Sequence, residues 1–181
     1  MEKLELAKSA VIMIDMQDKL LNVMNSPEQI LEQSVRMLKY SNALNVPVLA
    51  TEQYRKGLGE SNPQLLELLK PENVYEKIAF SAFECSDFKD ALNRISARSL
   101  VIFGIEAHIC VCQTALDALR AGYDVRVVAD AVDSRLPSNR QLALEKMRQA
   151  GAIIESTESV LYEWLGAAGT PEFKAILPLV K

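Results

Sequence analysis

Three side chains in this sequence have complementary chemistry: the carboxylate of Asp15, the ammonium of Lys77 and the thiol of Cys110. A cysteine attacks as the thiolate, so it needs a base that takes its proton and a neighbour that favours the anion. The chain has a single histidine, and we therefore consider Asp15 as that base. A nearby Lys77 would favour both the carboxylate and the thiolate by its opposite charge. Together the three residue types indicate nucleophilic attack on a carbonyl carbon.

Cys110 follows a predicted strand and lies in the first turn of a predicted helix. Residues 99–103 are apolar on both faces, as in a strand inside a parallel sheet, and residues 108–121 have the pattern of an amphipathic helix. The positive end of the helix dipole favours a thiolate there. Backbone N–H groups around Glu106 and Cys110 could hold an oxyanion, because the first turn of a helix leaves such groups unpaired.

Free cysteines are usually buried, so Cys110 could instead belong to the core. At about 100° per residue, Cys112, Ala115 and Leu119 share the helix face that packs on the sheet, and Cys110 points away from it. The phase therefore predicts that Cys112 is the structural cysteine. Residues two apart on a helix point in different directions, so no disulfide is expected between the two cysteines.

The single histidine, His108, limits the kinds of metal site that the chain can build. One histidine cannot supply a multi-histidine cluster or a His-Glu-x-x-His zinc site. On a helix, its position two residues before Cys110 turns it away from the thiol, and ordinary polar contacts are expected for it. We expect no metal and no cofactor.

Composition narrows the class of protein further. The chain has 181 residues, 49% of them hydrophobic and 24% charged, which predicts one well-packed domain over residues 1–181. The net charge of −4 gives no basic stripe for nucleic acid, and no apolar run reaches membrane-spanning length. The first residues lack a signal-peptide pattern, and three cysteines fit a reducing compartment better than a disulfide scaffold. We expect a cytoplasmic protein that binds neither nucleic acid nor a membrane.

Apolar runs and amphipathic segments alternate along the whole chain. Strands are predicted at residues 9–15, 48–51, 73–77, 99–103, 124–130 and 152–155. Helices are predicted at residues 26–44, 63–70, 86–95, 108–121, 138–150 and 159–165, and a loop at residues 54–61. This alternation predicts a Rossmann-like α/β fold, a three-layer α/β/α sandwich on a mostly parallel sheet of about six strands. Ligands of such sheets bind beyond the carboxyl ends of the strands, where Asp15, Lys77 and Cys110 all fall.

Three segments resemble the isochorismatase-like cysteine hydrolase family in sequence, order and spacing. They are residues 11–17, 76–83 and 104–111, and the resemblance covers nearly the whole chain. It implies an amide-hydrolysing site in which Asp15, Lys77 and Cys110 form a catalytic triad. It also implies that the chain forms homo-oligomers, as members of this family commonly do.

The same resemblance implies the form of the oxyanion site. A cis peptide bond between Ile105 and Glu106 would turn the Glu106 N–H toward the oxyanion, beside the N–H of Cys110. Residues 51–59 contain none of the histidines that nicotinamidases of the family use to bind metal, which places a metal site of that kind in doubt. True isochorismatases lack the cysteine, so Cys110 favours the amide-hydrolysing branch.

These observations lead to one main hypothesis and two alternatives. The chain is expected to be a metal-independent cysteine hydrolase that cleaves a non-peptide C–N bond of a small amide, imide or ureide through a thioester. The alternatives are a non-catalytic binding or scaffold protein of the same fold, and a thiol redox protein in which Cys85 would be the resolving partner. For the main hypothesis, the expected pocket residues are Gln17, Tyr54, Phe80 and Phe83.

Overall fold

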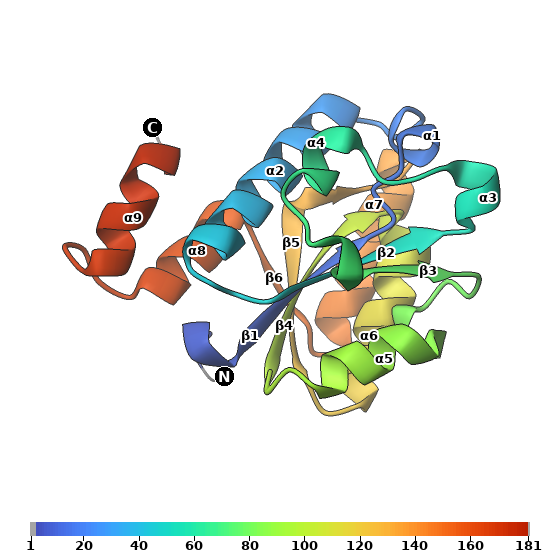
Figure 1. Cartoon of the computed structure of the whole chain (residues 1–181). Coiled ribbons are helices and arrows are strands. Elements are labelled where there is room, and N and C mark those ends of the chain that lie inside the picture. The colour runs from blue at the N-terminus through green and yellow to red at the C-terminus, as the bar shows by residue number, and fades with distance from the viewer. Residues whose placement is uncertain (1–2, 181) are drawn as a thin grey trace.

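A computed structural model describes residues 3–180, which form a six-stranded sheet with helices on both faces (Figure 1). The strands are β1 (Ser9–Ile14), β2 (Val48–Gln53), β3 (Val74–Lys77), β4 (Ser99–Ile105), β5 (Asp124–Asp133) and β6 (Ile153–Glu155). Their order in the sheet is β3-β2-β1-β4-β5-β6, and every neighbouring pair is parallel. The predicted three-layer α/β/α fold on a six-stranded sheet is confirmed.

Helices cover the sheet in two layers. They are α1 (Asp18–Leu21), α2 (Pro27–Ala43), α3 (Arg55–Leu58), α4 (Pro63–Leu66), α5 (Ser86–Asn93), α6 (Cys112–Arg120), α7 (Pro137–Gln149), α8 (Thr157–Leu165) and α9 (Pro171–Val180). Figure 1 shows α2 and α8 on one face, with α9 outside them, and α5 and α6 on the other face. A membrane-crossing helix would need greater length and a more continuous apolar surface, and none occurs among residues 3–180.

The structure differs from the sequence prediction at a few boundaries. The segment predicted as a loop at residues 54–61 contains the short helix α3, and the helix predicted at residues 63–70 ends at Leu66. Strands β2, β4 and β5 each continue two or three residues beyond the predicted end. The last residues of β2 and β5 are polar. The apolar pattern that predicted these strands stops before them, although the strand pairing continues.

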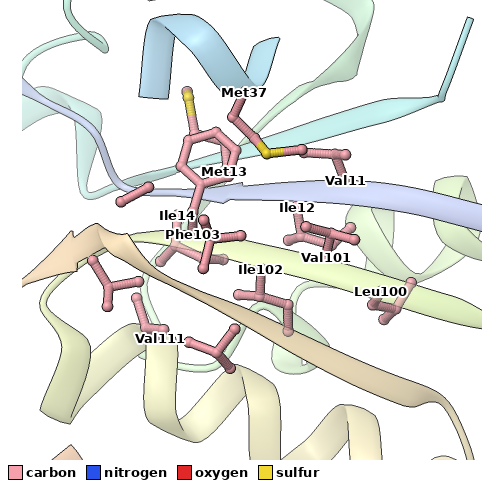
Figure 2. Packing of buried hydrophobic residues seen from close by; sticks show 14 of the residues in the cluster. Val11, Ile12, Met13, Ile14, Met37, Leu100, Val101, Ile102, Phe103 and Val111 are labelled. Carbon is pink, nitrogen blue, oxygen red and sulfur yellow. The ribbon is translucent and has the colours of Figure 1, made fainter. Parts of the chain in front are cut away.

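Strands β1 and β4 form the centre of the core. Every residue of both strands is buried, which explains why their sequences lack the polar alternation of a half-exposed strand. Figure 2 shows Met37 of α2 packing on one side of these strands and Val111 on the other. The sheet is therefore held between apolar helix faces, and its carboxyl edge is a rigid platform for side chains.

The strand order reverses between β1 and β4. In open α/β sheets this switch point is where ligands bind, because the connections leave in opposite directions and open a crevice. Asp15 directly follows β1, and Cys110 lies in the turn after β4. The fold thus places two of the three expected catalytic residues at the usual ligand position.

Gly104 brings β4 close to the end of β1. Its φ is +124°, a conformation that favours glycine, and a Cβ added there would overlap the backbone of Ile14, including the carbonyl oxygen. We expect Gly104→Ala to lower the free energy of unfolding by about 2–4 kcal/mol, from strain and overpacking together. Urea unfolding followed by fluorescence measures this.

Gly122 offers the matched control for that substitution. Its φ is +90°, but a Cβ there would have no atom within 4 Å. Gly122→Ala should therefore cost only the backbone strain, about 1 kcal/mol. Equal losses for the two alanine variants would contradict the assignment of a close contact at Gly104.

Candidate active site

A buried ion pair joins the ends of β1 and β3. Lys77 Nζ lies 2.6 Å from Asp15 Oδ2, and the two side chains are 1% and 0% exposed. Asp15 has a φ of +52°, in the left-handed region that aspartate tolerates better than most residues, and it turns the chain out of β1. The Lys77 side chain reaches past the end of β2 to meet it, because β2 lies between β1 and β3 in the sheet.

Cys110 completes this cluster. Its thiol lies close enough to Asp15 and Lys77 for both charges to act on its pKa, and the residue is only 6% exposed. Burial, and then the negative charge of Asp15, raise the pKa of the Cys110 thiol to about 12, whereas the Lys77 ammonium acts in the opposite direction. At neutral pH the proton therefore stays on sulfur, next to a carboxylate that can accept it.

The structure corrects one expectation about the thiol. The helix dipole was expected to favour the thiolate, but burial and then the negative charge of Asp15 raise the pKa of Cys110 instead. Cys112 is buried as expected, and Cys110 is buried as well, with Asp15 and Lys77 as its charged neighbours. A π-helical turn at Ala107–Val111 precedes α6, so the residues around Cys110 do not follow the 100° per residue of a regular helix.

The charged pair is held in place by two residues of β2 for which the sequence predicted no role in the site. Thr51 Oγ1 donates a hydrogen bond to Asp15 Oδ1 at 2.7 Å, and Gln53 Oε1 accepts one from Lys77 Nζ at 2.7 Å. A third bond from Lys77 Nζ, at 3.3 Å, ends on the carbonyl oxygen of Ala79 and uses the last ammonium proton. The signal in the sequence was the change from apolar to polar residues at the end of β2.

Gln17 and Phe83, which are expected pocket residues, make contacts within the fold. Gln17 is fully buried, and its amide donates to the carbonyl oxygens of Gln53 and Gly59, at 2.9 and 2.6 Å. It therefore fixes the loop after β2. Phe83 packs edge-on against Phe88, with ring centroids 6.0 Å apart, in an aromatic cluster beneath α5. These contacts do not test the pocket positions of the two residues, which stay predictions.

Tyr54 and Phe80 remain at the edge of the site. Tyr54 donates its backbone N–H to the Lys77 carbonyl oxygen at 2.9 Å, and Phe80 follows the Ala79 carbonyl that Lys77 contacts. Their side chains are 48% and 51% exposed. Exposed apolar surface beside a buried charged cluster is available to pack against a ligand.

Glu106 lies between β4 and the π-helical turn. The peptide bond between Ile105 and Glu106 is cis. The Glu106 carboxylate is turned away into bonds with Arg135, from the backbone N–H at 3.0 Å and from Nε at 3.1 Å. These two bonds fix the direction of the Glu106 side chain.

His108 makes the ordinary polar contacts expected for it. Nδ1 lies 2.9 Å from Ser134 Oγ, and Nε2 lies 3.4 Å from Asn139 Nδ2. Cys85, Cys110 and Cys112 are all free thiols. Among residues 3–180, no three histidine, cysteine or acidic side chains come together as metal ligands.

The raised pKa of Cys110 gives a pH dependence that labelling can measure. Iodoacetamide reacts with the thiolate, so labelling of Cys110 should rise about tenfold per pH unit from pH 7 to pH 10 without levelling off, because its pKa is about 12. N-acetylcysteine, with an ordinary thiol pKa, should level off above about pH 9. Peptide mass spectrometry measures the rate, and tryptophan fluorescence checks that the protein stays folded. A plateau for Cys110 near pH 8 would contradict the expectation.

Together, a parallel sheet with a switch point and a buried acid–lysine–cysteine cluster at that point define a three-layer α/β/α protein of the Rossmann-like type with a candidate active site. Residues 9–159 match the isochorismatase domain family, and the chain belongs to this family.

Comparisons with individual proteins agree over most of the chain. Isochorismatase family protein 1B of Dictyostelium discoideum is 38% identical over 181 residues, covering 96% of this chain and 86% of that protein. The structure of MAR1 ribonuclease from Caenorhabditis elegans superposes with a TM-score of 0.93 at 34% identity, over 99% of this chain and 92% of that one. YcaC from Pseudomonas aeruginosa, solved with hexane-2,5-diol and covalent acrylamide, has a TM-score of 0.91 at 27% identity, over 98% and 91% of the two chains.

Proposed function

We propose that this protein is a metal-independent cysteine hydrolase that cleaves the C–N bond of a small amide, imide or ureide. The observation that carries the proposal is the position of the Cys110 thiol near the buried Asp15–Lys77 pair, both members of which act on its pKa. A nucleophile, a base and a balancing cation in one water-poor cluster meet the needs of acyl transfer. A scaffold protein of the same fold would gain nothing from three buried charged or reactive groups, which are costly to bury.

The reaction proceeds in two half-reactions. Asp15 takes the Cys110 proton while sulfur attacks the substrate carbonyl carbon, and the N–H groups of Glu106 and Cys110 hold the resulting oxyanion. Asp15 then returns the proton to the departing nitrogen as the C–N bond breaks, which leaves a thioester on Cys110. Water attacks that thioester with Asp15 again as the base, and the acid leaves as the thiol is restored. Lys77 offsets the negative charge throughout.

We compare two reactions in the light of the relatives, and we favour amide hydrolysis through a covalent intermediate over cleavage of RNA. The Pseudomonas YcaC structure contains covalent acrylamide, which supports a nucleophile within the shared fold. The Caenorhabditis relative is described as a ribonuclease. A net charge of −4 and a nucleophile that is 6% exposed favour a small neutral substrate over RNA in this chain. We place the protein in the cytoplasm, where its free cysteines stay reduced.

The test is a panel of small amides, imides and ureides with detection of the released amine or ammonia. An oligoribonucleotide belongs in the panel as the competing substrate. Intact-mass measurement during turnover should show an acyl adduct on Cys110. RNA cleavage that survives loss of the thiol, with no amide turned over, would overturn the proposal.

Thr51 should act as a positioning residue for Asp15. Thr51→Val removes the 2.7 Å bond to the carboxylate with little change in shape, and a bond to a charged group contributes about 1.5–3 kcal/mol. We expect kcat/KM to fall about 10- to 100-fold with little change in KM, and Thr51→Ser to restore most of the activity. Steady-state kinetics measures this on the substrate found in the panel.

Thr157 provides a matched control, because its hydroxyl donates to Asp130 Oδ1 at 3.0 Å in a buried place outside the site. Thr157→Val should lose stability without losing kcat. If the two valine variants reduced kcat equally, the effect of Thr51 would be general destabilisation and not positioning.

A further inference from the structure

The C-terminal helix α9 is more apolar than its contacts require. Its last six described residues, 175–180, are all apolar, and six consecutive residues point to every side of a helix. Only Ile176 is fully buried, whereas Leu177 and Leu179 are 42% and 36% exposed. A helix that is apolar all round normally lies within protein. The second half of α9 therefore leaves apolar surface that a partner could cover.

That surface continues into a groove along α2. The groove has a volume of about 510 Å³ and is bounded by Pro178 and Leu179 of α9, by Gln64 of α4 and by one face of α2. Figure 1 shows α9 standing outside the main body, away from the carboxyl edge that carries the site, and α9 contacts α2. The face of α2 presents two half-buried apolar residues, Leu31 and Val35, in its middle.

Charges along this face of α2 are arranged in two blocks of opposite sign. Glu28 and Glu32 line the first half of the groove, and Arg36 and Lys39 line the second half. All four are exposed, and Arg36 and Glu32 side chains are 50% and 59% exposed even though they pair with each other at 2.8 Å. Glu28 and Lys39 are about 16 Å apart along the axis, at a rise of 1.5 Å per residue.

This arrangement is complementary to itself in the antiparallel direction. If a second α2 lies against the first across a twofold axis near residues 33–34, Glu28 lies opposite Lys39 of the second copy and Glu32 opposite its Arg36. Leu31 and Val35 then lie near the centre of the contact, and the charged residues run along one side of them. Apolar residues beside pairs of opposite charge are typical of an antiparallel helix pair.

We propose that the face formed by α2 and α9 is the contact between two copies of this chain, joined antiparallel through α2 across a twofold axis. The contact closes the groove and covers the exposed leucines of α9. It lies apart from the Asp15–Lys77–Cys110 cluster, so it does not depend on the proposed hydrolase activity.

Two charge-reversal variants test the contact. Glu28→Lys with Glu32→Lys makes the face entirely positive, and Arg36→Glu with Lys39→Glu makes it entirely negative. Each variant alone should associate about 100-fold more weakly than the wild type, because every cross-contact becomes repulsive. An equimolar mixture should recover the wild-type mass, since each positive face then meets a negative one. Light scattering after gel filtration, over a range of concentrations, measures the mass.

The control reverses exposed charges in the opposite layer of the fold. Lys89→Glu on α5 with Arg94→Glu directly after it should leave the mass unchanged, and circular dichroism should show that all variants are folded. A monomeric wild type, an unchanged mass for either α2 variant, or a mixture that fails to recover the wild-type mass would each overturn the proposal. So would an equal loss of mass in the α5 control.

Discussion

Cys110→Ala should reduce turnover by about 10⁴-fold or more and abolish the acyl adduct. The expected loss is this large because the thiol forms the covalent bond in the proposed mechanism, and the other members of the cluster have other roles in it. The cavity left by one sulfur atom in a 6% exposed position should cost only about 1–2 kcal/mol of stability. Initial rates at saturating substrate measure turnover, and the intact mass of the protein shows whether the adduct forms.

Cys112 is the matched control, because it is buried two residues away and has no contact with the charged pair. Cys112→Ala should lose a similar amount of stability and keep kcat within about twofold. A Cys110→Ala protein with near-normal turnover would refute the nucleophile, and a wild type that turns over nothing in the panel would favour the scaffold alternative.

The fold was predictable because its signals are local and repeated. Six apolar runs alternate with amphipathic segments, and a parallel sheet covered on both faces is the regular solution to that pattern. The strand-end positions of Asp15 and Lys77 followed from the same pattern, because parallel strands bring their carboxyl ends to one edge. The contact of these two side chains at 2.6 Å could not be predicted in the same way. It depends on the order of the strands in the sheet, and no local pattern in the sequence shows that order.

The state of the thiol could not be predicted from the sequence. The helix dipole is a local property that the sequence shows, whereas burial and the distance to Asp15 depend on how three distant segments pack. The π-helical turn at Ala107–Val111, which contains Cys110, has no marker in the residue types. Thr51 and Gln53 were missed for a similar reason: their side chains are ordinary for a strand end until Asp15 and Lys77 are placed beside them.

Loss of either charge in the buried Asp15–Lys77 pair should lower both the stability and the activity of the protein. Lys77→Met should lower the free energy of unfolding by about 3–5 kcal/mol, because it leaves the Asp15 carboxylate buried without its cation. Asp15→Asn should cost a comparable amount by leaving Lys77 unpaired, and asparagine suits the φ of +52° at that position. Both variants should lose turnover.

The double variant separates the two roles of the pair. With both charges removed, Asp15→Asn/Lys77→Met should be more stable than the sum of the single losses predicts, by about 2–3 kcal/mol, since no buried charge remains uncompensated. Its activity should stay lost, because the base is still missing.

The exposed pair of Asp117 and Arg120, at 2.6 Å with the arginine 73% exposed, serves as control, and Asp117→Asn should cost less than about 1 kcal/mol. Urea unfolding and the amide assay on the same samples measure both quantities. Recovery of turnover along with stability would show that Asp15 supports the fold and is not the base, and strictly additive losses would show that the two charges do not depend on each other.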